Sequence, residues 1–362
     1  MQLRNKLYWA TKAGLAFFLG VANLACTPAG SASAGAHPFD HADSASSGAG
    51  NAERILRERS GQTWKNRYSR DIPVRFAPAE LQQDGRVTLA ASFTPDGQTI
   101  FFSQANCRLI WECPQNLRRS DLTEQGWSTA RPVKLPQNAR SEAPNVSPDG
   151  RMLYFSWSGK SPLHNGCDRT ENFDLWQLDL TRPDALPVPV EGPDVVALRA
   201  GRVASLRYVN NETHPAVTES GNLYFMTERL DGMGERDIYF AASGPDGSFL
   251  RAEPLPAPIN SAARDEGVWV NPAETIMMMS YPGRGGSGGS DIFISFRTGE
   301  NWSEPVNVGE RINSSANDGS PRLTPDLQTL LFTSDRAFDG QREGLIQIWS
   351  VNFNIEEYRP SE

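Results

Sequence analysis

Short apolar runs and turn residues alternate along the chain in a unit that occurs five times. In each copy an apolar run leads into a turn, and a second run rich in Ile, Leu, Tyr, Phe or Met follows at once. The copies are SFTPDGQTIFFSQ (92–104), NVSPDGRMLYFSW (145–157), AVTESGNLYFMTE (216–228), WVNPAETIMMMSY (269–281) and RLTPDLQTLLFTS (322–334). Apolar runs of this length, bounded by turn residues, predict β-strands joined as hairpins.

The spacing of the copies predicts a repeat architecture. With Pro95, Pro148, Glu219, Pro272 and Pro325 taken as equivalent, the intervals are 53, 71, 53 and 53 residues. Repeats of several strands at such a period are typical of a β-propeller. A third strand is predicted at 116–122, 174–180, 237–243, 291–297 and 346–351, and a fourth at 127–135, 249–257 and 302–310. The fourth contains proline, which an outer edge strand tolerates.

The last copy ends without a fourth strand, and the missing strand is predicted near the N-terminus. VRFAPAEL (74–81) resembles NWSEPVNV (301–308) and precedes the first copy. We expect this segment to complete the last blade and close the ring, which leaves no open sheet edge. The fold class is therefore all-β, a propeller of five four-stranded antiparallel blades. A sixth blade is left open, if residues 51–85 or 181–210 hold a degenerate copy.

The repeated Ser/Thr-Pro-Asp-Gly turn, the aromatic second strand and the Asp-Ile/Leu-Trp/Tyr start of the third resemble the WD-repeat-like unit of TolB-type periplasmic proteins. The resemblance covers about residues 74–353. It implies the propeller fold and leaves function open, because the family includes binding scaffolds, peptidase propellers and polysaccharide-acting enzymes. TolB-type propellers usually have six blades and an extra N-terminal domain. The present prediction has neither, so a role in the Tol translocation system is not implied.

The N-terminus is typical of a bacterial export signal. Arg4, Lys6 and Lys12 precede the apolar stretch 14–25, which is too short to span a membrane and ends beside Cys26. We predict a lipoprotein signal at 1–26 with lipidation of Cys26, which anchors the protein in the periplasm or outer membrane. Ordinary cleavage after Ala34 or Ala36, giving a secreted protein, is the alternative. Residues 27–60 are predicted to form a flexible tether, and 61–362 the propeller domain.

Composition narrows the function classes. The formal net charge of −8 argues against general nucleic-acid binding, which needs a basic face for phosphates. The sequence contains no recognised catalytic motif and no metal-ligand spacing, so we expect no cofactor and no metal. A monomer that binds an envelope protein or glycan is the expected state, with the membrane reached only through the lipid anchor.

Candidate site residues lie in the connections opposite the Pro-Asp-Gly turns. Four acids precede the first strand at nearly equivalent positions, one beside a histidine, and the loops after the second strand bring basic residues to the same side. The acids are Glu142, Glu212, Glu266 and Asp318, the histidine is His214, and the basic residues are Lys160, Arg229, Arg284 and Arg336. Such a ring suits a cation, a basic peptide or a polyhydroxylated ligand. The structural alternative is that each acid caps loop amides or pairs with an arginine of the next blade.

Other side chains have simpler expected roles. Asp96, Asp149 and Asp326 are predicted to be turn residues. Aromatic residues at the start of the fourth strand, Phe76, Trp127, Phe249 and Trp302, are predicted to pack between blades. Trp111, Trp157 and Tyr281 are predicted to be exposed and to stack on a ligand. Cys107, Cys113 and Cys167 predict one disulfide, either Cys107–Cys113 or a bond to Cys167.

Two functions remain open. The first is a non-enzymatic module that presents the channel face to a protein, peptide or glycan. The second is an envelope enzyme, a polysaccharide hydrolase or lyase, that uses a pair among Glu142, Glu266 and Asp318. Binding acids should be spread evenly and solvated, whereas catalytic acids should form one close pair in which one pKa is raised.

Overall fold

The computed structural model describes residues 70–360 except 78, 83–84, 111–112, 137–138, 160–172, 197–210, 230–231 and 341. By its contacts the chain divides into residues 1–41 and 42–362, and all described residues belong to the second unit. The predicted signal, Cys26 and the tether lie outside the described residues. Within the described ranges, no helix is long and apolar enough to span a membrane. Strands predominate there, and one short 3-10 helix, η3 (Ile355–Tyr358), lies near the C-terminus.

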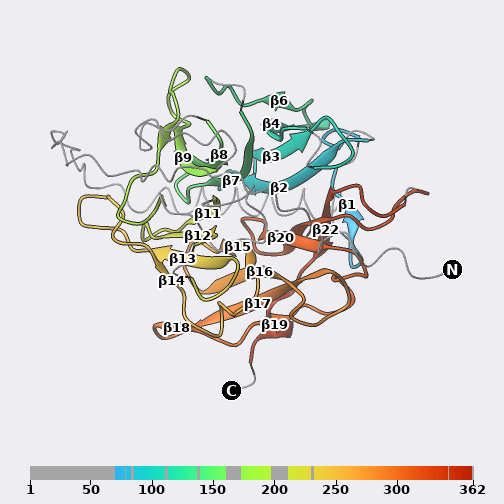
Figure 1. The fold of residues 1–362 in the computed structure, drawn as a ribbon. Coiled ribbons are helices and arrows are strands. Elements are labelled where there is room, and N and C mark those ends of the chain that lie inside the picture. Colours follow the sequence, from blue (N-terminus) through green and yellow to red (C-terminus); the bar gives the residue numbers. More distant parts are fainter. Residues whose placement is uncertain are drawn as a thin grey trace, which may run out of the picture. The chain divides into compact units, whose positions relative to one another are not determined.

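The strands form five antiparallel sheets, which confirms the predicted blades (Figure 1). The first blade contains β2 (Val87–Phe93), β3 (Thr99–Ala105), β4 (Asn116–Thr123), β5 (Gly126–Trp127) and β6 (Arg131–Pro132). The second contains β7 (Ser141–Val146), β8 (Met152–Trp157), β9 (Asp174–Asp179) and β10 (Val188–Pro189). The third contains β11 (Glu212–Val217), β12 (Leu223–Thr227), β13 (Asp237–Ala241) and β14 (Glu253–Pro254). The fourth contains β15 (Glu266–Val270), β16 (Ile276–Pro282), β17 (Ser290–Thr298), β18 (Asn301–Trp302) and β19 (Val306–Asn307). The fifth contains β20 (Asp318–Leu323), β21 (Thr329–Ser334), β22 (Gln347–Asn352) and β1 (Val74–Arg75).

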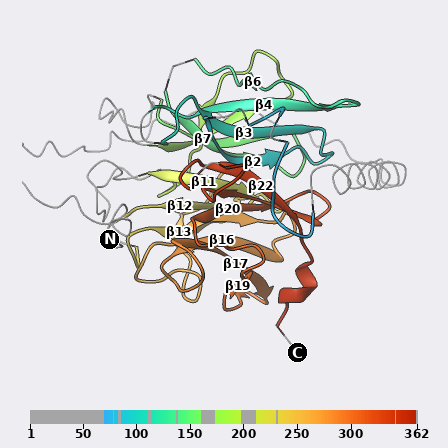
Figure 2. The same cartoon turned by 90° about the vertical axis from the view of Figure 1, so that its right-hand side faces the viewer.

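The first strands of the five blades lie side by side around a common axis. β2 contacts β7, β7 contacts β11, β11 contacts β15, β15 contacts β20, and β20 contacts β2. Figure 1 shows these strands at the centre, with the other strands of each blade outside them. Figure 2 shows the sheets from the side, with β4 and β19 far apart. Side chains of the first strands therefore meet at the axis, which is where a ligand site can draw on several blades.

The N-terminal segment closes the ring as predicted. Val74 pairs with Ser350 of β22, so β1 is the fourth strand of the fifth blade. The side chain of Gln82 then donates to the Ile348 carbonyl at 2.8 Å and accepts from the Ile348 amide at 2.6 Å. Asn260 makes the same pair of bonds to the third strand of the third blade. The segment thus supplies both the missing strand and a side-chain anchor of the repeat. The region 181–196 supplies β10 of the second blade and not a sixth blade.

The Pro-Asp-Gly turns have the predicted structural role. The Asp149 Oδ1 atom accepts from the Ser147 hydroxyl at 2.5 Å and from the Arg151 amide at 3.0 Å. The two equivalent acids, Asp96 and Asp326, each accept from the matching Thr hydroxyl and backbone amide. These side chains fix the hairpin and are not available for chemistry.

The structure confirms one prediction about the aromatic residues and contradicts another. Phe76, Trp127, Phe249 and Trp302 are buried, in agreement with packing between blades. Trp157 and Tyr281 are each only 1 % exposed, so the prediction that they stack on a ligand is wrong. Trp157 packs edge-on against Trp176, and the Tyr281 hydroxyl donates to the Ile259 carbonyl. The second strands are buried along nearly their whole length, and each lies between the first and third strands of its blade. Trp111 lies outside the described residues.

Candidate binding site at the ring axis

Every first strand carries a β-bulge, and the bulge gives the five blades a common frame. The strand pairing shifts register at this point in each blade. The bulge residue has a positive φ between 45° and 64° in Ala90, Ala143, His214, Gly267 and Ser320. These residues are spaced by 53, 71, 53 and 53 positions, the same intervals as the turns. Equivalent positions in the five blades are therefore those that lie the same number of residues from the bulge.

The four predicted acids occupy two positions in this frame, so their supposed equivalence is wrong by one residue. Glu212 and Asp318 lie two residues before the bulge, as does Asp265, which the sequence analysis missed. Glu142 and Glu266 lie one residue before it. Adjacent residues of a strand face opposite sides, so the two sets point in different directions. We call Glu212, Asp265 and Asp318 the buried row, and Glu142 and Glu266 the axial row.

The buried row is structural. All three acids are 0 % exposed. Asp318 accepts from the Ser314 amide at 2.6 Å and pairs with Arg336 at 2.6 Å. Glu212 accepts from the Thr227 hydroxyl at 3.0 Å and pairs with Arg229 at 3.2 Å. Burial raises the pKa of Glu212 to about 8 and that of Asp265 to about 6. The bond from the Ser314 amide to Asp318 agrees with the capping of loop amides in the structural alternative. The two ion pairs differ from its other form, because each lies within one blade and not with an arginine of the next.

The predicted basic residues belong mainly to this buried scaffold. Arg229 also donates to the carbonyls of Asp194 and Val195, and Arg336 to that of Ile312. Arg284 donates to the Pro258 carbonyl at 2.7 Å, and its guanidinium lies 4.1 Å from the centre of the Tyr281 ring. Lys160 lies outside the described residues.

The axial row joins a cluster of charges that the sequence analysis did not find. Arg236, directly before β13, pairs with Glu228 and, at 2.8 Å, with Glu266. Arg264 pairs with the same oxygen of Glu266 at 2.6 Å. We call Glu142, His214, Glu228, Arg236, Arg264 and Glu266 the axial cluster. Arg236 was detectable in principle, because it is charged where the other four blades have an uncharged residue before the third strand. Those residues are Gln115, Phe173, Ser290 and Ile346.

The two acids of the axial row have opposite electrostatic surroundings. Burial alone would raise the pKa of Glu266, but Arg236 and Arg264 outweigh it and hold the pKa below its usual value. Burial raises the pKa of Glu142, and the charges of Arg140 and Arg236 offset this only in part. Among the described residues the Glu142 carboxyl has no hydrogen bond and no ion pair. It is only half-buried, so it remains accessible from the axis.

His214 reaches across the axis. Its Nε2 atom lies 3.2 Å from the Ser320 hydroxyl of the fifth blade, and its Nδ1 atom lies 3.3 Å from the Thr213 hydroxyl. Burial, followed by the charge of Arg236, lowers the pKa of His214 to about 4 although Glu266 opposes the shift. The imidazole is therefore neutral at neutral pH and serves as a hydrogen-bonding group.

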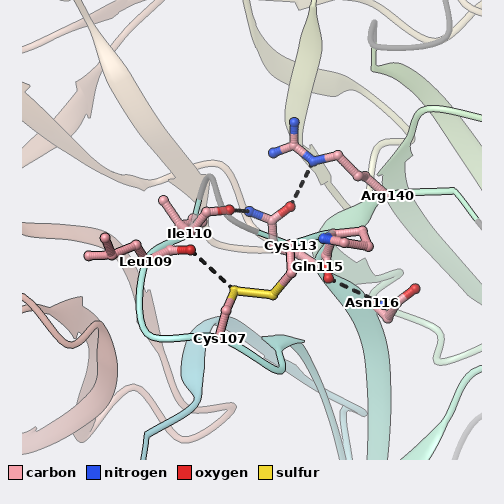
Figure 3. The surroundings of a disulfide bond; sticks show 8 residues. Cys107, Leu109, Ile110, Cys113, Gln115, Asn116 and Arg140 are labelled. Carbon is pink, nitrogen blue, oxygen red and sulfur yellow. Dashed lines mark hydrogen bonds between the residues drawn. A yellow bond between two sulfur atoms is a disulfide. The ribbon is translucent and has the colours of Figure 1, made fainter.

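The disulfide loop of the first blade supports one side of this site (Figure 3). Cys107 and Cys113 are bonded, which selects the first of the two predicted pairings, and Cys167 lies outside the described residues. Gln115 donates to the Ile110 carbonyl of this loop at 3.1 Å and accepts from Arg140 Nε at 2.9 Å (Figure 3). Because Arg140 lies two residues before Glu142, the loop and the axial row are fixed to one another.

The described residues contain no group of three or more His, Cys, Asp or Glu side chains arranged to hold a metal ion. The axial cluster is instead a network of three carboxylates and two guanidinium groups. Such a network can orient a charged ligand group, and its unpaired member is Glu142.

Comparison with known proteins returns structures but no sequence family. No family model matches the chain, and no curated protein matches it. A GH43 endo-arabinanase from Bacillus licheniformis is similar with a TM-score of 0.47 and 12 % identity, over 76 % of this chain and 98 % of that one. A candidate TolB from Agrobacterium tumefaciens gives 0.44 and 14 %, over 74 % and 78 %. TolB from Acinetobacter baumannii gives 0.43 and 15 %, over 73 % and 57 %. At these scores the likenesses assign neither a family nor an activity.

Proposed function

We propose that the protein is an exported, lipid-anchored binding module that presents its axial cluster to a ligand of the cell envelope. The export signal at 1–26 and the tether at 27–60 supply the setting. A protein, a peptide or a glycan is the expected class of ligand. The observation that carries the proposal is the Glu142 carboxyl, which is half-buried and has no partner among the described residues.

The neighbouring arginines do not neutralise Glu142 directly, because they are engaged elsewhere. Arg236 binds Glu228 and Glu266. Arg140 binds Gln115, and its guanidinium lies 4.9 Å from the centre of the Phe173 ring. A cationic group of a ligand would supply the missing partner, and a charge-assisted hydrogen bond in a partly desolvated site contributes more than one at an exposed surface. A basic side chain of a protein or peptide is therefore the group that we expect at Glu142.

The test compares the full-length wild type with Glu142→Gln and with Glu124→Gln, an exposed glutamate in the turn after β4. Both variants lose one negative charge, so general electrostatics are matched. Proteins captured from envelope extracts are identified, purified and titrated against each form. We expect Glu142→Gln to weaken binding by about tenfold or more, since a hydrogen bond to a charged group is worth about 1.5–3 kcal/mol, whereas Glu124→Gln should bind like wild type.

A partner that binds Glu142→Gln as tightly as wild type would contradict a role for this site. Glycan ligands are tested by titrating the same three proteins with soluble envelope polysaccharides. Loss of glycan binding in Glu142→Gln alone would keep the site and assign the ligand to the glycan class.

A second function is favoured by the opposite pKa shifts of Glu142 and Glu266. A pair of carboxyl groups whose pKa values are driven apart is the arrangement by which glycoside hydrolases assign an acid and a base or nucleophile. In that case Glu142 is the general acid and Glu266 the ionised partner. The test is release of reducing ends from envelope polysaccharides, which Glu142→Gln and Glu266→Gln should abolish and Glu124→Gln should not. Activity that survives both substitutions would exclude this pair.

A further inference from the structure

Arg322 differs from the other arginines near the axis in what it contacts. It lies on β20, two residues after the bulge at Ser320, and its side chain spans to two other blades. Its Nη1 atom donates to the Ser92 hydroxyl of the first blade, and its Nη2 atom donates to the Pro144 carbonyl of the second, both at 3.3 Å. Both acceptors are neutral and both bonds are long, so the guanidinium is weakly held.

Among the described residues Arg322 forms no ion pair. Arg229, Arg236 and Arg336 each have a carboxylate partner. The charge of Arg322 helps to lower the pKa of His214, so this imidazole is neutral at neutral pH and supplies no counter-charge. Burial lowers the pKa of Arg322 to about 9, so the side chain is still charged under physiological conditions. A partly buried charge without a counter-charge is costly.

Arg322 has unused donors that an anion can accept from. A guanidinium has five N–H donors in a planar fork, and only two are used here. Ser92 accepts from the Val146 amide at 2.9 Å and from Arg322, which leaves its own hydroxyl proton to donate. A fork of this kind recognises the paired oxygens of a carboxylate or phosphate.

We propose that Arg322 binds an oxyanion, a carboxylate or phosphate group, at the ring axis, with the Ser92 hydroxyl as a second donor. The site does not use the Glu142 carboxyl: its donors are Arg322 on β20 and Ser92 on β2. The anion supplies the counter-charge that the protein does not provide, and it comes either from free phosphate or from the carboxylate of a larger ligand.

The experiment measures binding to the full-length protein by calorimetry and thermal unfolding, with sodium phosphate and sodium acetate as probes and sodium chloride at matched ionic strength as the reference. Wild type should bind phosphate, acetate or both, and its melting temperature should rise with the bound anion relative to chloride. Arg322→Gln should weaken that binding by about tenfold or more. Arg322→Lys keeps the charge without the fork and should fall between the two.

The matched control is Arg151→Gln, which removes an exposed positive charge from the turn before β8 and should leave binding unchanged. Phosphate binding alone would identify a phosphate site, and acetate binding alone a carboxylate site. Equal stabilisation of wild type and Arg322→Gln by the anions, or no stabilisation of either, would overturn the proposal. Folding of Arg322→Gln is checked independently, since its melting temperature in chloride should equal or exceed that of wild type.

Discussion

The buried row and the axial row are one residue apart in the repeat, yet their acids have different roles. Asp318 is completely buried and satisfied by Ser314 and Arg336. Glu142 is half-buried and has no partner among the described residues. Both stand just before a bulge in a first strand, and both are acids in a similar sequence context. The difference shows that the strand register decides whether an acid stabilises the blade or faces the axis.

The same comparison applies within the axial row. Glu266 is bound by Arg236 and Arg264, and its pKa is lowered, whereas Glu142 has no such contact and its pKa is raised. Equivalent backbone positions therefore do not give equivalent chemistry. The partner residues come from two connections: Arg236 lies between β12 and β13 within the third blade, and Arg264 lies between β14 of the third blade and β15 of the fourth.

The largest effect is expected when the buried row is broken. Asp318→Ala removes the counter-charge of Arg336 and the acceptor for the Ser314 amide, and leaves a largely buried guanidinium with only neutral acceptors. Breaking a buried ion pair in this way typically costs about 3–5 kcal/mol. We expect the free energy of unfolding, measured by urea denaturation, to fall by that amount. A loss below about 1 kcal/mol, the range of an exposed ion pair, would show that the buried row is not structural.

A smaller, pH-dependent effect is expected from His214, the bulge residue of the third blade. Its pKa falls from 6.5 to about 4 in the folded protein. Between these values the unfolded chain binds a proton that the folded protein does not, so stability falls as the pH is lowered through this range. From pH 7 to pH 5 the contribution is about 2 kcal/mol.

The check is to measure the free energy of unfolding of wild type and His214→Asn at both pH values. Asparagine tolerates the positive φ of this position, so the backbone should be kept. The variant should lose about 2 kcal/mol less than wild type on acidification. Equal losses would mean that His214 titrates normally in the folded protein.

The sequence predicts the fold well because the turn signals recur in the same unit, three times at an interval of 53 residues and once at 71. The Pro-Asp-Gly turns, the strand ranges and the closing strand at 74–81 all depend on local patterns, and the strand pairing agrees with them. The site is predicted only in part. Glu142, His214 and Glu266 all interact electrostatically with Arg236. The bulge, however, adds one residue to each first strand and has no marker in the sequence shared by all blades. The acids were therefore aligned one residue out of register.

Two other errors have physical causes. Arg236 and Arg264 lie in loops, and their pairing with Glu266 depends on tertiary contacts that no local pattern encodes. Trp157 is the last residue of β8 and Tyr281 the last but one of β16, positions at which side chains are often exposed, but neighbouring side chains cover both. The interpretation of Asp96, Asp149 and Asp326 succeeded because their bonds are formed within the turn itself.

The smallest effect on stability is expected at Glu142, and it is also the sharpest test of the comparison. Glu142→Gln removes a charge that has no partner, so the free energy of unfolding at pH 7 should change by less than about 0.5 kcal/mol or rise slightly. Glu266→Gln, the matched variant in the same row, weakens bonds to Arg236 and Arg264 and should cost about 1–3 kcal/mol.

The effect of Glu142→Gln should also depend on pH, because the pKa of Glu142 is raised in the folded protein. As the pH rises above the ordinary pKa of a glutamate, ionisation of Glu142 destabilises the folded protein; at lower pH its protonation removes that cost. Any gain from Glu142→Gln at pH 7 should therefore vanish near pH 4. A loss at pH 7 equal to that of Glu266→Gln would mean that Glu142 is part of the structural network and not an open binding group.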